Sequence, residues 1–220
     1  LPMLKRLLLR YPHLRRLIVV ADRGLLSLDN LDDLATLKLP GERTLEYILA
    51  VPAARYGDFA GDLKRLSEAQ PSDQAWCAET KWQDNRLVVA HDPEVATRRG
   101  QARDKTIAEL VAMGQQCGDK LDGQDAGKRA KGRPMSDSGT KARFYHAVKD
   151  AHMAHVIKVD LKADLFSYSI DEDKKHYLEL LDGKLLLVTN TNTPAAEVVQ
   201  RYKSLADIER GFRVLKSDIE

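Results

Sequence analysis

The chain of 220 residues contains little cysteine, few aromatic residues and no long apolar run. Its two cysteines, Cys77 and Cys117, stand far apart and form no C-x-x-C pair, which argues against a cysteine zinc site and a disulfide framework. The sequence also lacks a P-loop, a dinucleotide-binding glycine fingerprint and a nucleophile elbow, so the common nucleotide-binding and serine-hydrolase classes have no support. Because the apolar runs are too short to cross a bilayer and no secretory signal precedes them, we expect a cytoplasmic protein without a membrane partner.

Charge is nearly balanced over the whole chain. Charged residues make up 31% of the sequence, but the formal net charge is only +2, so any nucleic-acid site has to come from local clustering. One cluster occupies residues 128–143, KRAKGRPMSDSGTKAR, where six basic residues stand against a single acid, Asp137. Two interpretations stay open for this segment: a flexible basic loop that neutralises DNA phosphates, or a solvated linker.

Residues 202–216, YKSLADIERGFRVLK, predict one amphipathic helix with two neighbouring stripes. We expect the apolar stripe to pack and the polar stripe to face a cleft. From the spacing alone, a solvated charged flank is the alternative interpretation of the polar stripe. The polar stripe consists of Tyr202, Glu209, Arg213 and Lys216, and the apolar stripe of Leu205, Ile208, Phe212, Leu215 and Ile219.

A second motif lies near the N-terminus, in residues 17–27, LIVVADRGLLS. Residues 17–21 form an apolar, β-branched run of the kind found in buried central strands. Asp22 follows this run, and the C-terminal end of a buried strand is where α/β folds place their sites. A turn signal comes next, and Ser27 can cap a helix over residues 28–38. The alternative is a purely structural Asp22, in a turn or helix cap.

Together the two segments resemble the signatures of DDE transposases of bacterial insertion sequences, in the insertion-sequence-four superfamily. Tyr202, Glu209 and Lys216 match the pattern Y-x2-R-x3-E-x6-K in register, while Leu205 occupies the arginine position. The strand that ends at Asp22 resembles the element carrying the second aspartate of the DDE triad. The resemblance implies an α/β fold, namely a ribonuclease-H-like catalytic core interrupted by an inserted α+β region.

The resemblance also implies DNA cleavage and strand transfer by metal-dependent phosphodiester chemistry. Asp22 and Glu209 are then the catalytic metal ligands for Mg²⁺ or Mn²⁺, since carboxylate oxygens are ligands that Mg²⁺ prefers. The implied partners are the terminal inverted repeats and the target DNA, bound by a homodimer on paired ends in a bacterial, nucleoid-associated setting. The implied DNA-binding residues are Tyr202, Lys203, Arg213, Lys216 and Arg23, with Lys203 or Arg213 supplying the charge that is missing at Leu205.

The first aspartate of the family's triad has no counterpart here, because the 21 residues before Asp22 contain no acid. The chain also begins without methionine and ends within a helical pattern, so we expect a piece of a transposase that is inactive on its own. One alternative is a non-catalytic DNA-binding protein of the same fold. Another is an unrelated nuclease built on other acids, such as Asp58, Asp62 or Asp160. The register of Tyr202, Glu209 and Lys216 favours the transposase.

We expect three regions along the chain. Residues 1–52 form the first part of the core, residues 53–183 an inserted region with hairpins, helices and the basic loop, and residues 184–220 the last core strand and the glutamate-bearing helix. Strands are expected over residues 45–51, 155–159, 166–170 and 184–189. A hairpin pairs residues 79–82 with 86–90 around a turn at Asp84 and Asn85, and helices are expected over 62–69 and 102–116. Asn192 or Thr193 caps the last helix, with Pro194 in its first turn.

Overall fold

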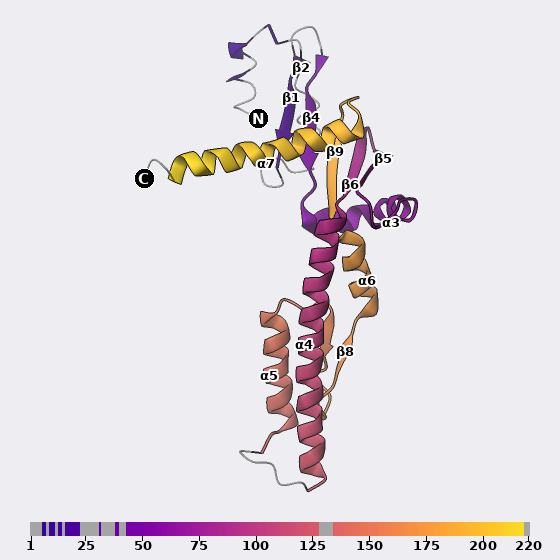
Figure 1. Ribbon diagram of the computed structural model, residues 1–220, viewed down its shortest axis with the longest axis vertical. Coiled ribbons are helices and arrows are strands. Elements are labelled where there is room, and N and C mark those ends of the chain that lie inside the picture. The colour runs from indigo at the N-terminus through magenta and orange to yellow at the C-terminus, as the bar shows by residue number, and fades with distance from the viewer. Residues whose placement is uncertain are drawn as a thin grey trace. The chain divides into compact units, whose positions relative to one another are not determined.

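The computed structural model shows a mixed α/β protein whose chain divides into two compact units (Figure 1). The first unit comprises Leu1–Pro93 and Gly183–Glu220, and the second Glu94–Asp182. In the described part of the chain, no helix is long and apolar enough to cross a membrane. The structure describes residues 6–7, 9–11, 13–14, 16–22, 31, 38–39, 43–127 and 134–217, without the side chains of residues 39, 43, 206 and 209–217.

The first unit is built on a five-stranded mixed sheet with the order β1-β4-β9-β6-β5. Strand β1 runs parallel to β4, and every other neighbouring pair is antiparallel. The strands predicted near both ends of the sequence are confirmed, with boundaries that move by no more than one residue. The strand expected to be central, β1, instead lies at the edge of the described sheet. The five strands are β1 (Ile18–Ala21), β4 (Glu46–Ala50), β5 (Trp76–Trp82), β6 (Asn85–His91) and β9 (Lys184–Thr189).

The sequences of the central strands are almost continuously apolar because both faces of the sheet are covered. On one face, Ile48 and Leu187 pack against Val198 of helix α7 (Ala195–Ser217). On the other face, Leu49 and Leu186 are no more than 1% exposed. Alternating side chains of one strand therefore point into two apolar environments, and no polar residue interrupts the run.

Strands β5 and β6 form the expected hairpin, but its turn lies one residue earlier than predicted. Trp82 pairs with Asn85, so the two turn residues are Gln83 and Asp84, and Gln83 takes a φ of 51°. Asn85 belongs to the strand, where its Oδ1 accepts a hydrogen bond from the Tyr47 hydroxyl at 2.5 Å. This tertiary contact fixes Asn85 in the ladder although its residue type favours turns.

The other elements of the first unit lie around this sheet. Helix α7 crosses it and contacts β1, β4, β5 and β6 (Figure 1). The carbonyl of Pro194 accepts from the amide of Val198 at 3.0 Å, so Pro194 immediately precedes the helix. The helix expected over residues 28–38 falls mainly outside the described residues. The remaining elements are β2 (Lys38–Leu39), β3 (Arg43–Thr44), η2 (Ala53–Phe59) and α3 (Ala60–Glu68), the last matching the helix predicted over 62–69.

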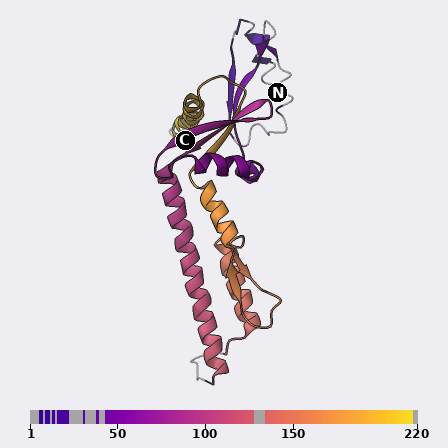
Figure 2. The same ribbon diagram turned by 90° about the vertical axis from the view of Figure 1, so that its right-hand side faces the viewer.

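The second unit is mainly helical, and Figure 2 shows its helices running alongside one another. Its core joins Ile107 and Leu110 of the first helix to Phe144 and Val148 of the second. The helix predicted over 102–116 is the middle of a much longer helix, and the strands predicted over 155–159 and 166–170 are confirmed in shorter form. The elements are α4 (Pro93–Asp125), α5 (Asp137–Asp150), β7 (Ile157–Val159), β8 (Tyr168–Ile170) and α6 (Glu172–Leu181).

The unit boundaries differ from the insertion expected over residues 53–183. The hairpin of β5 and β6 belongs to the first unit, because β6 pairs with β9 along its whole length. The compact region between the two parts of the first unit is therefore Glu94–Asp182. Sequence patterns identified the hairpin itself but not its long-range partner strand.

The expectation of a flexible basic loop over 128–143 is wrong for residues 137–143, which begin helix α5. The Ser136 hydroxyl caps this helix by accepting from the Gly139 amide at 3.2 Å. Lys141 is only 7% exposed, and its ammonium donates to the backbone carbonyls of Ala163 and Asp164. One of the six basic residues thus holds a loop of its own unit. Residues 128–133 lie outside the described residues.

Candidate functional site

The two sequence motifs meet at the C-terminal end of strand β1. Asp22 follows the last residue of this strand, and Tyr202 lies on helix α7, 180 residues further along the chain. The Tyr202 hydroxyl donates a hydrogen bond to Asp22 Oδ1 at 2.6 Å. Both residues are half-buried. The structure therefore brings together one residue from each motif.

Strand alternation explains why the two side chains meet. Ile18 and Val20 pack in the apolar cluster that also contains residues of α7. Asp22 lies two residues after Val20, and alternate residues of a strand point to the same face of the sheet. The Tyr202 ring packs against this cluster, as do Val198 and Val199 one turn earlier on the helix. A tyrosine suits this position because its ring is apolar and its hydroxyl can reach a polar partner.

This packing corrects the expected division of the last helix into a packed and an open stripe. Tyr202 continues the packed face that Val198 and Val199 begin, so its stripe faces the sheet at this point. Ile208, expected to pack, is 54% exposed. The packed face is set by residues upstream of Tyr202, which the motif window of 202–216 does not include.

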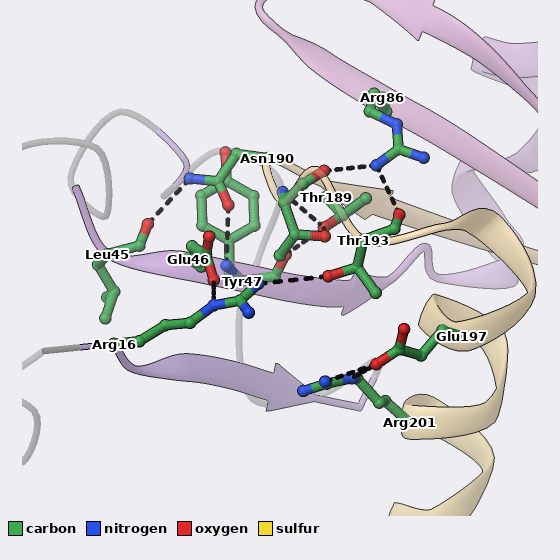
Figure 3. A network of polar contacts seen from close by, with 11 residues as sticks. Arg16, Leu45, Glu46, Tyr47, Arg86, Thr189, Asn190, Thr193, Glu197 and Arg201 are labelled. Carbon is green, nitrogen blue, oxygen red and sulfur yellow. Dashed lines mark hydrogen bonds and ion pairs between the residues drawn. The ribbon is translucent and has the colours of Figure 1, made fainter. Parts of the chain in front are cut away.

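A polar network fixes the connection between β9 and α7 (Figure 3). Asn190, the first residue after β9, uses both ends of its amide. Its Oδ1 accepts from the Tyr47 backbone amide at 2.9 Å, and its Nδ2 donates to the Leu45 carbonyl at 2.9 Å. One side chain thus satisfies a backbone donor and a backbone acceptor at the start of β4.

Threonines and an arginine complete this network. The Thr189 hydroxyl donates to the Tyr47 carbonyl at 2.6 Å and accepts from the Thr191 amide at 3.1 Å. Arg86, from β6, donates from Nη1 to the carbonyls of Thr191 at 2.5 Å and Thr193 at 2.9 Å. These bonds tie the connection to two strands of the sheet, so they determine where α7 starts.

Ion pairs at the surface of the same region involve further arginines (Figure 3). Arg16 Nε lies 2.6 Å from Glu46 Oε2, and this hydrogen bond and the carboxylate charge raise the pKa of Arg16. Arg201 Nη2 lies 2.6 Å from Glu197 Oε1 on the same helix. Exposed pairs of this kind contribute little to stability, typically about 0–1 kcal/mol. They place cations near the start of α7, a feature that the motifs do not reveal.

The remaining predicted site residues are described only in part. Lys203 follows Tyr202 and is exposed. Arg23 lies outside the described residues. Glu209, Arg213 and Lys216 lie on α7, where the structure describes the helical backbone but not these side chains. Among the described side chains, no three of His, Cys, Asp or Glu gather as a metal-binding group.

Neither protein-family models nor curated proteins nor solved structures yielded a match to the chain. The function is therefore argued from the site itself. That site consists of a carboxylate at the end of a β-strand, held by a phenol from a helix whose sequence carries Glu209 and Lys216. Carboxylate oxygens are ligands that suit hard divalent cations such as Mg²⁺ and Mn²⁺.

Proposed function

We propose that the chain is part of the catalytic core of a DDE transposase of the insertion-sequence-four superfamily, which cleaves and joins DNA by metal-dependent phosphodiester chemistry. The 2.6 Å hydrogen bond between Tyr202 and Asp22 carries the proposal. It joins the two segments that resemble the aspartate and glutamate motifs of the family. Motifs that matched by coincidence would have no reason to meet across 180 residues.

The sheet topology supports a ribonuclease-H-like core. Such a core would place the glutamate-bearing helix on one face of the sheet, against a strand that ends at an aspartate. Here Asp22 follows β1, which runs parallel to β4, and α7 packs on both strands. The apolar contacts of Val198 with Ile48 and Leu187 hold the helix on that face.

Helical register relates Glu209 to Tyr202. A spacing of seven residues is almost two turns, which leaves the two positions within about 20° of one face. The same spacing corresponds to about 10.5 Å along the helix axis. Since the α7 backbone is helical through Ser217, Glu209 belongs to the face that carries Tyr202, and Lys216 repeats the interval.

The proposed chemistry gives each residue type a task. Divalent ions about 3.5–4 Å apart activate the attacking oxygen and stabilise the leaving oxygen of phosphodiester cleavage. Asp22 and Glu209 supply oxygen ligands, with Asp22 at a fixed place at the strand end. Lys203, Arg213 and Lys216 bind DNA phosphates as cations. Arg23 follows Asp22 in sequence and adds a further cation next to it.

Metal binding by the chain as it stands tests the proposal. Cleavage is a poor readout, because no acid precedes Asp22 and we expect no nicking from this polypeptide alone. Electron paramagnetic resonance should detect Mn²⁺ binding that Asp22→Asn and Glu209→Gln each weaken at least about tenfold. Asp62→Asn is the matched control, since Asp62 pairs with Arg65 at 3.0 Å on the surface of α3. Equal Mn²⁺ affinity in all four proteins would contradict the proposal.

The same experiment separates the two alternative functions. A non-catalytic DNA-binding protein of this fold would bind duplex DNA with strong salt dependence but would bind no Mn²⁺. An unrelated nuclease would lose Mn²⁺ binding when Asp58, Asp62 or Asp160 is changed. Each of these acids already has a structural partner: Asp58 pairs with Arg55 at 2.9 Å, and Asp160 Oδ1 accepts from two backbone amides of its own loop.

A further inference from the structure

We propose that Tyr202 is a positioning residue for the Asp22 carboxylate and not a contact to the DNA backbone. This inference rests on the proposed function and assigns Tyr202 a role different from the phosphate contact that the family resemblance implies. A tyrosine hydroxyl has one proton to donate, and phosphate oxygens accept hydrogen bonds. Tyr202 gives that proton to Asp22 Oδ1. The same proton is therefore not available to a phosphate while this bond exists.

The length of the bond fits a hydrogen bond from a phenol to a carboxylate oxygen. The separation is 2.6 Å, and O–H···O⁻ bonds of this type fall at about 2.5–2.7 Å and are stronger than neutral ones. A carboxylate bonded in this way at one oxygen loses rotational freedom. Asp22 is thus held in one orientation as a ligand of the proposed metal site.

Tyr202 is suited to this task because its own position is fixed. Its ring packs against the apolar cluster that contains Val20 and Val199, and the start of its helix is held by Asn190 and Arg86. Side chains that hydrogen-bond to metal ligands affect metal affinity by about 10–100-fold when they are removed. The hydroxyl also links β1 to α7, so it couples the strand that carries Asp22 to the helix that carries Glu209.

Tyr202→Phe removes the hydroxyl and keeps the ring, so it tests the positioning role with little change in packing. We expect Mn²⁺ affinity, measured by electron paramagnetic resonance, to fall about 10–100-fold. The matched control is Tyr47→Phe, which removes a hydroxyl bond of 2.5 Å to Asn85 in the same unit and does not touch Asp22. Tyr47→Phe should leave Mn²⁺ affinity unchanged.

Two outcomes would overturn the positioning role. If Tyr202→Phe binds Mn²⁺ normally but binds duplex DNA more weakly in fluorescence anisotropy, Tyr202 contacts phosphate. If Tyr202→Phe and Tyr47→Phe lower the urea unfolding midpoint equally and neither changes Mn²⁺ affinity, the hydroxyl is merely structural.

A further comparison distinguishes failure of this inference from failure of the proposed function. Normal Mn²⁺ affinity in Tyr202→Phe, with affinity lost in Asp22→Asn, would leave the proposed function standing and reject the positioning role. Absence of Mn²⁺ binding by the unaltered chain would reject both. In that case, non-additive urea midpoints for Tyr202→Phe, Asp22→Asn and the double variant would show that the contact serves the fold alone.

Discussion

The two units of the chain bury polar groups in different ways. In the first unit, the described buried polar residues include Thr189, Thr191 and Thr193, which are neutral and share several hydrogen bonds around one connection. In the second unit, Arg103 and Lys141 are buried cations that each hold a separate segment. A shared network of several hydrogen bonds distributes the effect of losing one bond, whereas an isolated buried charge depends on its own partner. The comparison therefore predicts unequal costs for single substitutions.

Arg103→Ala should have the largest effect on stability. Arg103 Nη1 lies 2.6 Å from Asp182 Oδ2, and the two side chains are only 9% and 14% exposed. Removing the arginine leaves a buried carboxylate without this partner, which typically costs about 3–5 kcal/mol. Urea unfolding should show this loss, and amide hydrogen exchange should locate it in α4 and α6.

The matched control for this prediction removes both charges. Arg103→Met combined with Asp182→Asn leaves no buried charge at this place, so it avoids the cost of an unpaired buried carboxylate. We therefore expect the double variant to be more stable than Arg103→Ala. If the double variant loses as much as the single one, packing and not charge accounts for the role of Arg103.

Asn190→Asp tests the network of the first unit and should have an intermediate effect. The substitution keeps the oxygen that accepts from the Tyr47 amide but places a second oxygen against the Leu45 carbonyl, where Nδ2 donates at 2.9 Å. A part-buried acceptor without its donor costs about 1–3 kcal/mol. Urea unfolding should show a loss in this range, smaller than that of Arg103→Ala.

Asn85→Asp offers the same chemical change at a site that tolerates it. Asn85 uses Oδ1 as an acceptor for the Tyr47 hydroxyl, and a carboxylate keeps this acceptor. We expect little change in the unfolding midpoint. Equal losses in Asn85→Asp and Asn190→Asp would mean that the added charge, and not the lost donor, causes the effect.

The difference between the units also explains how far the sequence predicts the fold. Strands β4 and β9 are predictable because the sheet is covered on both faces, which makes their sequences continuously apolar. Helix α5 is hard to predict, because Thr140 and Lys141 occupy buried positions and interrupt its apolar periodicity. Helix α6 has no fully buried residue, so the only local signal is Asp171, whose carboxylate caps the helix by accepting from the Lys174 amide.

The motif residues of the candidate site are predictable from the sequence, but the residues that hold helix α7 in place are not. The sequence predicts a role for Asp22 at a strand end and for Tyr202 in a helical register, and the structure adds their direct contact. Asn190 and Arg86 belong to no motif, because their partners lie 105–145 residues away in the chain. Only tertiary pairing shows that they fix the helix that carries Tyr202. The run of polar residues after β9 is the one local signal of such a connection.

The smallest effect is expected from His155→Gln in the second unit, measured as a change in pH dependence. Burial, and then the charges of Lys174 and Lys158, lower the pKa of His155 below its usual 6.5. The folded state therefore binds this proton less readily than the unfolded state. Stability is full above about pH 6.5 and declines as the pH falls toward the folded pKa.

His155→Gln should flatten the pH dependence of stability in the second unit between about pH 7 and pH 5. The measurement is the amide-exchange protection factor, which corrects for the intrinsic effect of pH on the exchange rate. Lys174→Gln should flatten this pH dependence in part, because removing that charge brings the pKa of His155 closer to its usual value. Since the histidine is only partly covered and remains exposed to solvent, solvent screens these charges and both changes are small. A steeper loss of stability at acid pH in either variant would contradict this prediction. It would show that protonated His155 stabilises the unit instead of opposing its folding.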